Sequence, residues 1–335
     1  MQYAFRMQHI RIRSIVTCSI AVFIAVALAI PGSLGHAVTR APAFERIFVI
    51  VLENQDYVDV QANPYFAQLA SRGQLLTNYW AITHPSQPNY VAMIFGDTMS
   101  ITNSDVTDIP GRNLVDQLEE NGFTWKTYQE DYPGNCYTPK YESDLHLYGR
   151  KHNPFISADT VRTDPERCAR IVPANVLTDD LAAGTLPDFS FYAPNALHNS
   201  HNTDIPTAAA WLSAFLEPKL KDPVFMDRML VVIVWDEGGG GAPEPSQVSA
   251  ILLGNAVRPG TTDARRYDHY SLLRTIQQQW NLGTLNRRDK NAALIRIFQQ
   301  GNYSGLNQYF PRNALFLPPS GEGLARFAVE NGWPE

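Results

Sequence analysis

The sequence predicts an α/β fold, a three-layer sandwich in which helices cover a central, mostly parallel sheet. Two unbroken apolar runs, at residues 47–52 and 229–235, are rich in β-branched side chains. Such runs are typical of strands that are buried on both faces, as in parallel sheets. Segments of helical character alternate with these and other apolar runs, which favours parallel strands joined by helices.

The individual elements follow from local signals along the chain. Strands are predicted at residues 44–52, 75–81, 123–128, 187–192, 229–235 and 248–253. Helices are predicted at residues 63–72, 113–121, 208–216 and 270–280, the first two closed by Gly73 and Gly122. Residues 129–175 lack clear periodicity, so we expect an excursion that is held by a disulfide and helps to line a pocket.

Composition indicates a globular protein. The chain has 335 residues, of which 44% are hydrophobic and 18% are charged, with a formal net charge of -6. The sequence pI of about 5.8 and the lack of a basic stripe argue against nucleic acid as a partner. The sequence does not predict an oligomeric state.

The N-terminus differs in composition from the rest of the chain. Three arginines, Arg6, Arg11 and Arg13, precede an apolar run over residues 15–30, and the small residues Gly35 and Ala37 stand at the positions that a signal peptidase reads. This pattern predicts a signal peptide at residues 1–37, followed by a single catalytic domain at 38–335. The protein is therefore expected to be secreted or periplasmic, with an uncleaved membrane anchor as the alternative. No later segment is long and apolar enough to predict a membrane span.

The cysteines fit an exported protein. Cys18 lies within the predicted signal peptide, which leaves Cys136 and Cys168 in the mature chain. Two cysteines in an exported protein predict one disulfide. They also exclude a cysteine-based metal cluster.

A loop at residues 84–90 is expected to present Ser86 at the start of a helix. Pro88 is tolerated in a first helical turn, and the apolar residues that follow can continue the helix up to Gly96. At the N-cap, the Ser86 oxygen would face unpaired backbone N–H groups and the positive end of the helix dipole, which favours an anion or an alkoxide. The alternative is an ordinary helix cap.

Two acidic pairs follow the two strongest strands. Glu53 and Asn54 come directly after one strand, and Asp236 and Glu237 after the other. The carboxyl ends of strands in an open α/β sheet meet at one crevice, where converging carboxylates call for a cation. We expect one divalent ion, Mg²⁺, Ca²⁺, Mn²⁺ or Zn²⁺, with Ser86 as a further ligand. The alternative is that each pair is a solvated strand end.

Histidines in predicted loops are further candidates. His152, His201 and His269 could each donate a hydrogen bond to a phosphoryl oxygen or protonate a leaving group. Taken singly, each could instead be a surface residue. His84 and His198 are weaker candidates, because each has a better-placed neighbour.

Together these segments resemble the bacterial and fungal phosphoesterase family of secreted acid phosphatases and phosphatidylcholine-type phospholipases C, which has an alkaline-phosphatase-like core. The matching segments are residues 51–54, 84–90, 151–155, 187–201, 234–239 and 268–274. The resemblance implies that Glu53, Asn54, Asp236 and Glu237 bind the metal and that Ser86 is the nucleophile and also touches the metal. It implies that His152 and His201 are catalytic and that Asn54, His152, His201 and His269 contact the substrate.

One departure from the family pattern concerns the neighbourhood of His201. Relatives often carry Asp beside it, whereas this chain has Asn199 and Asn202, with Asp204 close by. The departure puts a second metal or an acid at this position in doubt.

The expected function is hydrolysis of a small-molecule or lipid phosphate ester by a secreted, metal-dependent enzyme. We expect a phosphomonoesterase of the acid phosphatase type, with a phosphoserine intermediate on Ser86. One alternative is a phospholipase C-type phosphodiesterase that acts on phospholipids, and another is an exported, non-enzymatic module that binds metal or phosphate. A sulfatase is disfavoured, because Asn89 and Tyr90 follow Ser86 where formylglycine formation requires a different context.

Overall fold

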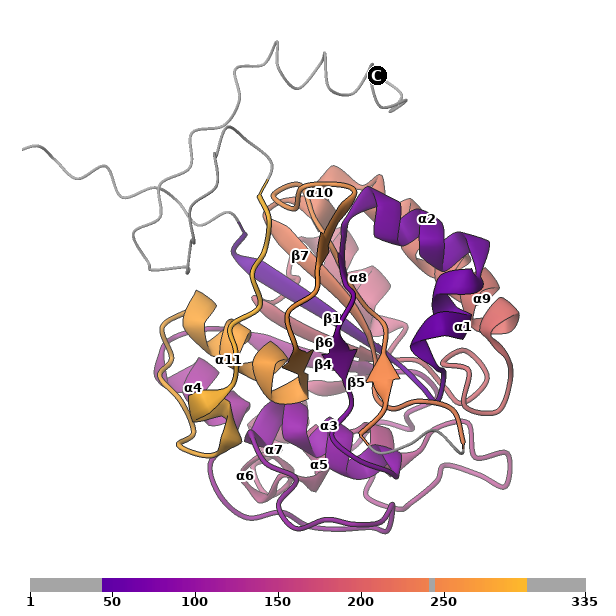
Figure 1. The fold of residues 1–335 in the computed structure, drawn as a ribbon. Coiled ribbons are helices and arrows are strands. Elements are labelled where there is room, and N and C mark those ends of the chain that lie inside the picture. The colour runs from indigo at the N-terminus through magenta and orange to yellow at the C-terminus, as the bar shows by residue number, and fades with distance from the viewer. Residues whose placement is uncertain (1–43, 241–244, 300–335) are drawn as a thin grey trace, which may run out of the picture. The chain divides into compact units, whose positions relative to one another are not determined.

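A computed structural model describes residues 44–240 and 245–299 (Figure 1). The predicted signal peptide, residues 1–37, lies outside the described residues. Within those two ranges, no helix combines the length and the apolar character that crossing a bilayer requires.

The central sheet has eight strands in the order β10-β2-β9-β7-β1-β6-β4-β5, and a second sheet has the order β11-β3-β8. All neighbours in the large sheet pair in parallel, except that β9 runs antiparallel to β2 and to β7. The strands are β1 (Arg46–Leu52), β2 (Gln74–Leu76), β3 (Tyr79–Trp80), β4 (Trp125–Gln129), β5 (Ile171–Pro173), β6 (Phe189–Ala193), β7 (Met229–Trp235), β8 (Gln247–Val248), β9 (Ala250–Leu253), β10 (Thr261–Asp263) and β11 (Tyr267–Asp268).

Helices lie on both sides of the large sheet (Figure 1). Phe48 of β1 packs against Phe225 of α10 on one face, with ring centroids 5.3 Å apart. Phe191 of β6, which pairs with the residue after Phe48, packs against Tyr90 of α3 and Phe155 of α5. Successive residues of a strand point to opposite faces, so these contacts mark the two helical layers. The predicted three-layer α/β fold is thus confirmed.

The helices in these layers vary widely in length. The α-helices are α1 (Tyr57–Ala62), α2 (Pro64–Arg72), α3 (Ser86–Phe95), α4 (Leu114–Glu120), α5 (Pro154–Ser157), α6 (Asp159–Arg162), α7 (Pro165–Cys168), α8 (Val176–Ala183), α9 (Ile205–Leu220), α10 (Pro223–Met226) and α11 (His269–Gln279). Two 3₁₀-helices, η1 (Arg150–His152) and η2 (Arg288–Asn291), complete the described elements. The helices predicted at residues 63–72, 113–121, 208–216 and 270–280 correspond to α2, α4, α9 and α11.

Two strands that we predicted as single elements are each divided between the two sheets. Residues 75–81 form β2 in the large sheet and β3 in the small one, and residues 248–253 form β9 and part of β8. The break in the first falls at Thr77 and Asn78, whose side chains donate hydrogen bonds to the carbonyls of Asp263 and Ala264. Because that partner segment is distant in sequence, the hydrophobic pattern alone could not place the break.

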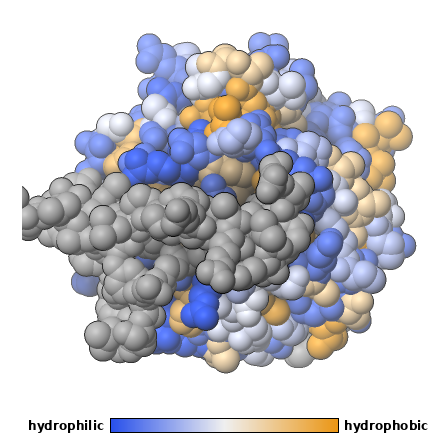
Figure 2. Space-filling model, turned by 90° about the horizontal axis from the view of Figure 1, so that it is seen from above, coloured by the Kyte–Doolittle hydropathy of each residue, from blue (hydrophilic) through white to orange (hydrophobic). Residues whose placement is uncertain are grey.

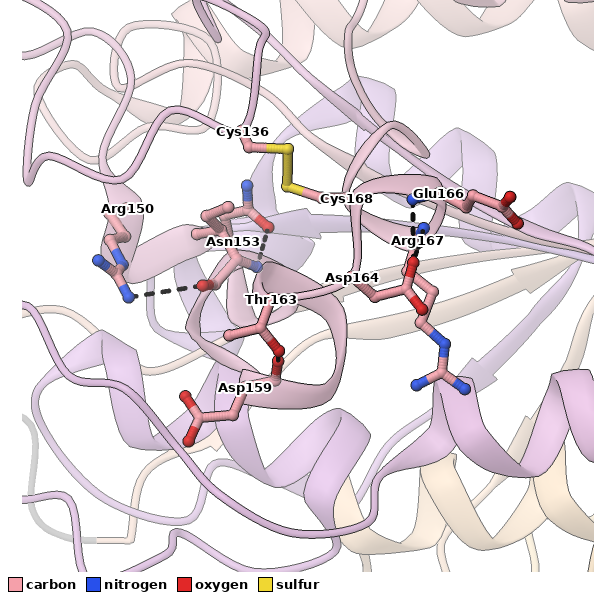
Figure 3. The surroundings of a disulfide bond; sticks show 10 residues. Cys136, Arg150, Asn153, Asp159, Thr163, Asp164, Glu166, Arg167 and Cys168 are labelled. Carbon is pink, nitrogen blue, oxygen red and sulfur yellow. Dashed lines mark hydrogen bonds between the residues drawn. A yellow bond between two sulfur atoms is a disulfide. The ribbon is translucent and has the colours of Figure 1, made fainter.

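The excursion over residues 129–175 contains short helices and the edge strand β5. A disulfide joins Cys136 to Cys168, with the Cα atoms 5.7 Å apart (Figure 3). Below it, Asn153 caps α5 by accepting a hydrogen bond from Ile156 N, and Arg150 donates to the Ile156 carbonyl (Figure 3). The excursion is therefore an ordered segment that can hold the residues between Arg150 and Asn153 in place.

Helix α3 lies in the interior, and all ten of its residues are buried. It begins at Ser86 with Pro85 as the N-cap, one position earlier than predicted, and ends at Gly96 with a left-handed φ of 69°. Before it, Asn89 Oδ1 accepts hydrogen bonds from the backbone N–H groups of Ile82 and Thr83. Asn89 therefore ties the loop to the first turn of the helix and fixes where Ser86 lies.

The surface in Figure 2 is mostly hydrophilic, with smaller hydrophobic patches between the polar residues. The exposed large hydrophobic side chains of the described residues come from separate segments, namely Val58, Val106, Leu145, Leu197 and Val224. The two longest strands, β1 and β7, keep nearly all of their side chains in the interior.

Candidate active site

The centre of the site is the shared end of β1 and β7. The parallel register pairs Leu52 with Trp235, so Glu53 and Asp236 leave the sheet side by side. The Asp236 N–H still donates to the Leu52 carbonyl, at 2.9 Å. Both carboxylates are fully buried. The predicted convergence of the two acidic pairs is therefore present in the fold.

The residues that follow these acids turn sharply toward one another. Asn54 has a left-handed φ of 55°, a conformation that Asn tolerates better than most residues. Asp236 Oδ1 accepts hydrogen bonds from the backbone N–H of Glu237, at 2.7 Å, and of Asn54, at 3.3 Å. Within the described residues, the buried Asp236 Oδ2 and Asn54 Oδ1 have no hydrogen-bond partner. Unpaired buried oxygens are costly, and a bound cation would satisfy them.

Ser86 lies between two carboxylates. Its Oγ is 3.1 Å from Glu53 Oε2 and 3.0 Å from Glu237 Oε1. The side chain is only 1% exposed and belongs to the first turn of α3, where the positive end of the helix dipole favours negative charge on the oxygen. The geometry brings the predicted nucleophile and the predicted metal ligands into one cluster.

Two predicted histidines extend this cluster on the other side of Glu53. His152 Nε2 is 3.0 Å from Glu53 Oε1, and the His152 and His201 rings are 5.8 Å apart. Glu53, His152 and His201 can each bring one ligand atom to within 4.8 Å of the others. Glu53 therefore joins an oxygen-rich group around Ser86 to a nitrogen-containing group.

His269 lies behind the acidic residues. It is fully buried, and its Nε2 donates to the Asp236 carbonyl at 2.6 Å, while its Nδ1 accepts from the Tyr79 hydroxyl at 3.2 Å. Burial lowers the pKa of His269 to about 4, so the ring is neutral at pH 7. Both ring nitrogens are thus engaged, and the contact with substrate that we expected for His269 remains a prediction.

Burial and mutual repulsion dominate the electrostatics of the carboxylates. Burial, followed by the charges of Glu53 and Glu237, raises the pKa of Asp236 well above its usual value. Burial and the charge of Glu53 likewise raise the pKa of Glu237 to about 7. Burial is the largest single influence and acts to raise the pKa of Glu53, but His152, Lys151 and His201 together outweigh it and lower the value to about 2. The cluster carries more acid groups than it can ionise without a compensating cation.

These donors fit a divalent cation. Glu53, Asp236, Glu237, the Asn54 amide oxygen and Ser86 Oγ form an all-oxygen set, which suits the hard ions Mg²⁺, Ca²⁺ and Mn²⁺. The unpaired buried oxygens of Asp236 and Asn54 are the structural sign that the set is incomplete by itself. The nearby histidine nitrogens would also suit Zn²⁺.

Two residues that contribute to the cluster were not among the predicted site residues. His84 was only a weak candidate from the sequence. Its Nδ1 atom lies 2.5 Å from Glu237 Oε2. Lys151 directs its Nζ to His201 Nε2, at 2.7 Å. His84 lies two residues before Ser86, and Lys151 lies directly before His152, so proximity to a predicted site residue was the available signal for both. Only the folded chain shows which groups they contact.

We expect His84 to support metal binding by orienting the Glu237 carboxylate. Replacing a residue that hydrogen-bonds a metal ligand typically weakens metal affinity by about 10- to 100-fold. His84→Ala should show a loss of this size when Mg²⁺, Ca²⁺ or Mn²⁺ is titrated into chelator-treated protein. His146→Ala, which changes an exposed histidine that stacks on Tyr141, is the control. Equal affinities in His84→Ala and the wild type would contradict this role.

Comparisons with known proteins identify the fold and the family of this chain. The fold is that of the alkaline phosphatase superfamily: a crystal structure of a protein in that superfamily from Vibrio parahaemolyticus superposes with a TM-score of 0.51 and 13% identity, covering 88% of this chain and 89% of that one. Residues 53–283 match the family described as the Phosphoesterase family, and the chain belongs to that family. The matched range begins at Glu53 and contains every site residue predicted from the sequence.

Two curated relatives illustrate the range of this similarity. An acid phosphatase from Aspergillus fumigatus is 36% identical over 76% of this chain and 59% of its own length. A phosphatidylinositol-3-phosphatase from Mycobacterium tuberculosis is 30% identical over 74% of this chain and 81% of its own. The chain spans about three fifths of the length of the fungal acid phosphatases that it matches.

Proposed function

We propose that this protein is a metal-dependent phosphoesterase that hydrolyses phosphomonoesters, as an acid phosphatase does, with Ser86 as the nucleophile. The observation that carries the proposal is the position of Ser86 Oγ, which is buried between Glu53 and Glu237 at the start of α3. The acid phosphatase relatives support the same reaction class. The disulfide between Cys136 and Cys168 supports export, since disulfides persist in oxidising compartments.

Glu53, Asn54, Asp236 and Glu237 would hold one divalent ion, with Ser86 as a further ligand. A bound divalent ion would lower the pKa of the Ser86 hydroxyl and stabilise the charge of the phosphoryl group. The protein residues supply the geometry: the hydrogen bonds to Asp236 Oδ1 fix its carboxylate, and His152 Nε2 lies 3.0 Å from Glu53 Oε1.

In the proposed reaction, Ser86 Oγ attacks the phosphorus as its proton passes to a neighbouring carboxylate. The bond between phosphorus and the ester oxygen breaks, and the alcohol leaves after it gains a proton. The dipole of α3 favours the developing negative charge at Oγ. Water then attacks the resulting phosphoserine, which releases inorganic phosphate and restores the hydroxyl. His152 would donate a hydrogen bond to a phosphoryl oxygen or protonate the leaving alcohol.

A substrate panel with and without a chelator tests this function. We expect the protein to hydrolyse 4-nitrophenyl phosphate faster than phosphatidylcholine, to lose activity in EDTA, and to regain it when a divalent ion is returned. Preferential cleavage of the phospholipid would favour a phospholipase C-type phosphodiesterase instead. Unchanged activity after the ion has been stripped would contradict the dependence on metal.

A lipid-borne monoester is the second candidate substrate. The relative from Mycobacterium tuberculosis is a phosphatidylinositol-3-phosphatase, and the alignment covers 81% of its length. Adding phosphatidylinositol 3-phosphate in vesicles to the same panel separates the two monoester classes. Inactivity against every phosphate ester, with metal and inorganic phosphate still bound, would indicate a non-enzymatic binding module.

A further inference from the structure

Lys151 brings a positive charge into the site. Its side chain is half-buried, and Nζ lies 2.7 Å from His201 Nε2. His201 in turn lies close to the acidic cluster, because one ligand atom each from Glu53, His152 and His201 lies within 4.8 Å of the others. Among the described residues, its ammonium forms no ion pair with a carboxylate. The charge is therefore held beside the acidic cluster without being neutralised in a salt bridge.

The hydrogen bonds of His201 explain how the ammonium is held. His201 Nδ1 is 2.6 Å from Asn202 Oδ1, an oxygen that can only accept, so the ring hydrogen is on Nδ1. The lone pair on Nε2 is then free to accept a hydrogen from Lys151. The backbone N–H of His201 donates to Asn199 Oδ1, at 2.8 Å, and anchors the ring. One of the three ammonium hydrogens is used in this way, and the other two can meet a ligand.

A continuous set of contacts links Lys151 to the nucleophile. Ser86 Oγ contacts Glu53, and Glu53 contacts His152. The rings of His152 and His201 then lie 5.8 Å apart, and His201 holds Lys151. A phosphate ester positioned for attack by Ser86 has anionic oxygens that require positive partners. The Lys151 ammonium, at the end of this set of contacts, can supply one.

We propose that Lys151 is a catalytic residue that binds a non-bridging phosphoryl oxygen, and that His201 is a positioning residue that aims its ammonium. This inference rests on the proposed function and adds to it a phosphate-binding group. It also bears on the number of metal ions. The His201 Nε2 lone pair that accepts from Lys151 is the one that a cation on Glu53, His152 and His201 would need, so the chain should bind one divalent ion.

The test compares Lys151→Met and Lys151→Arg with the wild type. Methionine keeps much of the lysine stem and removes the charge. The control is Lys140→Met, which changes an exposed lysine of the same excursion that pairs with Asp105. For each protein, calorimetry measures binding of inorganic phosphate to the form loaded with Mg²⁺, Ca²⁺ or Mn²⁺. Metal analysis gives the ions per chain, and thermal unfolding reports folding.

We expect Lys151→Met to fold, to keep one divalent ion per chain, and to bind phosphate about 10- to 100-fold more weakly, as the loss of a charge-assisted hydrogen bond predicts. Lys151→Arg should recover part of the affinity, and Lys140→Met should match the wild type. Because phosphate binding needs no turnover, a weakened Lys151→Met supports the proposal even if no phosphate ester is hydrolysed. Unchanged phosphate affinity in Lys151→Met, no phosphate binding by the wild type, or two ions per wild-type chain would overturn it.

Discussion

Replacing Ser86 by alanine should lower the turnover of phosphate esters by at least about 10³-fold, because the reaction loses the atom that attacks phosphorus. The variant should still fold, since the change removes one hydroxyl and leaves the apolar residues of α3 that are buried in the interior. Divalent-ion binding should persist at reduced affinity, because Glu53, Asn54, Asp236 and Glu237 remain. Steady-state rates with 4-nitrophenyl phosphate, together with metal titration, measure both effects.

The matched control is Ser190→Ala. Ser190 is a fully buried serine of β6 whose hydroxyl has no hydrogen-bond partner among the described residues. Its removal should leave turnover close to that of the wild type, so the comparison separates loss of a nucleophile from loss of any buried hydroxyl. Residual activity in Ser86→Ala near the wild-type rate would rule out the serine mechanism.

Replacing Asp236 by asparagine should lower the stability of the protein in the presence of metal and raise it in the absence of metal. The variant loses a charged ligand, so divalent-ion affinity should fall by more than about 100-fold, and turnover should fall with it. An ion at 100 times its dissociation constant stabilises the wild type by about 2.7 kcal/mol, and the variant should lose most of this stabilisation. Thermal unfolding with added Mg²⁺, Ca²⁺ or Mn²⁺ measures the difference.

Without metal, Asp236→Asn should be more stable than the wild type at neutral pH. The folded state raises the pKa of Asp236, chiefly by burial, so the folded protein binds more protons than the unfolded chain above the usual value of 3.8. The stability of the metal-free wild type should therefore fall as pH rises through this range, and the asparagine variant lacks that loss. Unfolding in EDTA from pH 4 to pH 8 tests the sign. A variant that is less stable than the wild type at every pH would contradict it.

The strands that carry the site could be predicted because their signal is local. The apolar runs at residues 47–52 and 229–235 are long, and the acids that end them project from the same edge once the strands pair in parallel. The start of α3 was predictable to within one residue, because Pro88 and Gly96 mark its two ends.

The remaining features depend on contacts between distant segments. The division of residues 75–81 between two sheets follows from pairing with residues 261–268, which no local pattern reports.

The short helices α5 and α7 did carry a local signal, since each has an Asx N-cap followed by proline, at Asn153-Pro154 and Asp164-Pro165. Lack of periodicity over residues 129–175 obscured that signal.

The roles of His84 and Lys151 could not be predicted in the same way. Each acts through one specific atom of a distant residue, His84 through Glu237 Oε2 and Lys151 through His201 Nε2. A sequence shows that a histidine or lysine lies next to a motif, but the direction of its side chain depends on the tertiary fold.

The most direct test of the account is to identify the side chain that carries the phosphoryl group during turnover. The metal-loaded protein is mixed with excess 4-nitrophenyl phosphate, quenched in denaturant at neutral pH so that phosphoserine and phosphohistidine both survive, digested and analysed by mass spectrometry. We expect a phosphoryl group on Ser86 in the wild type and none on that peptide in Ser86→Ala. A phosphoryl group recovered on another residue, such as His152 or His201, would contradict it.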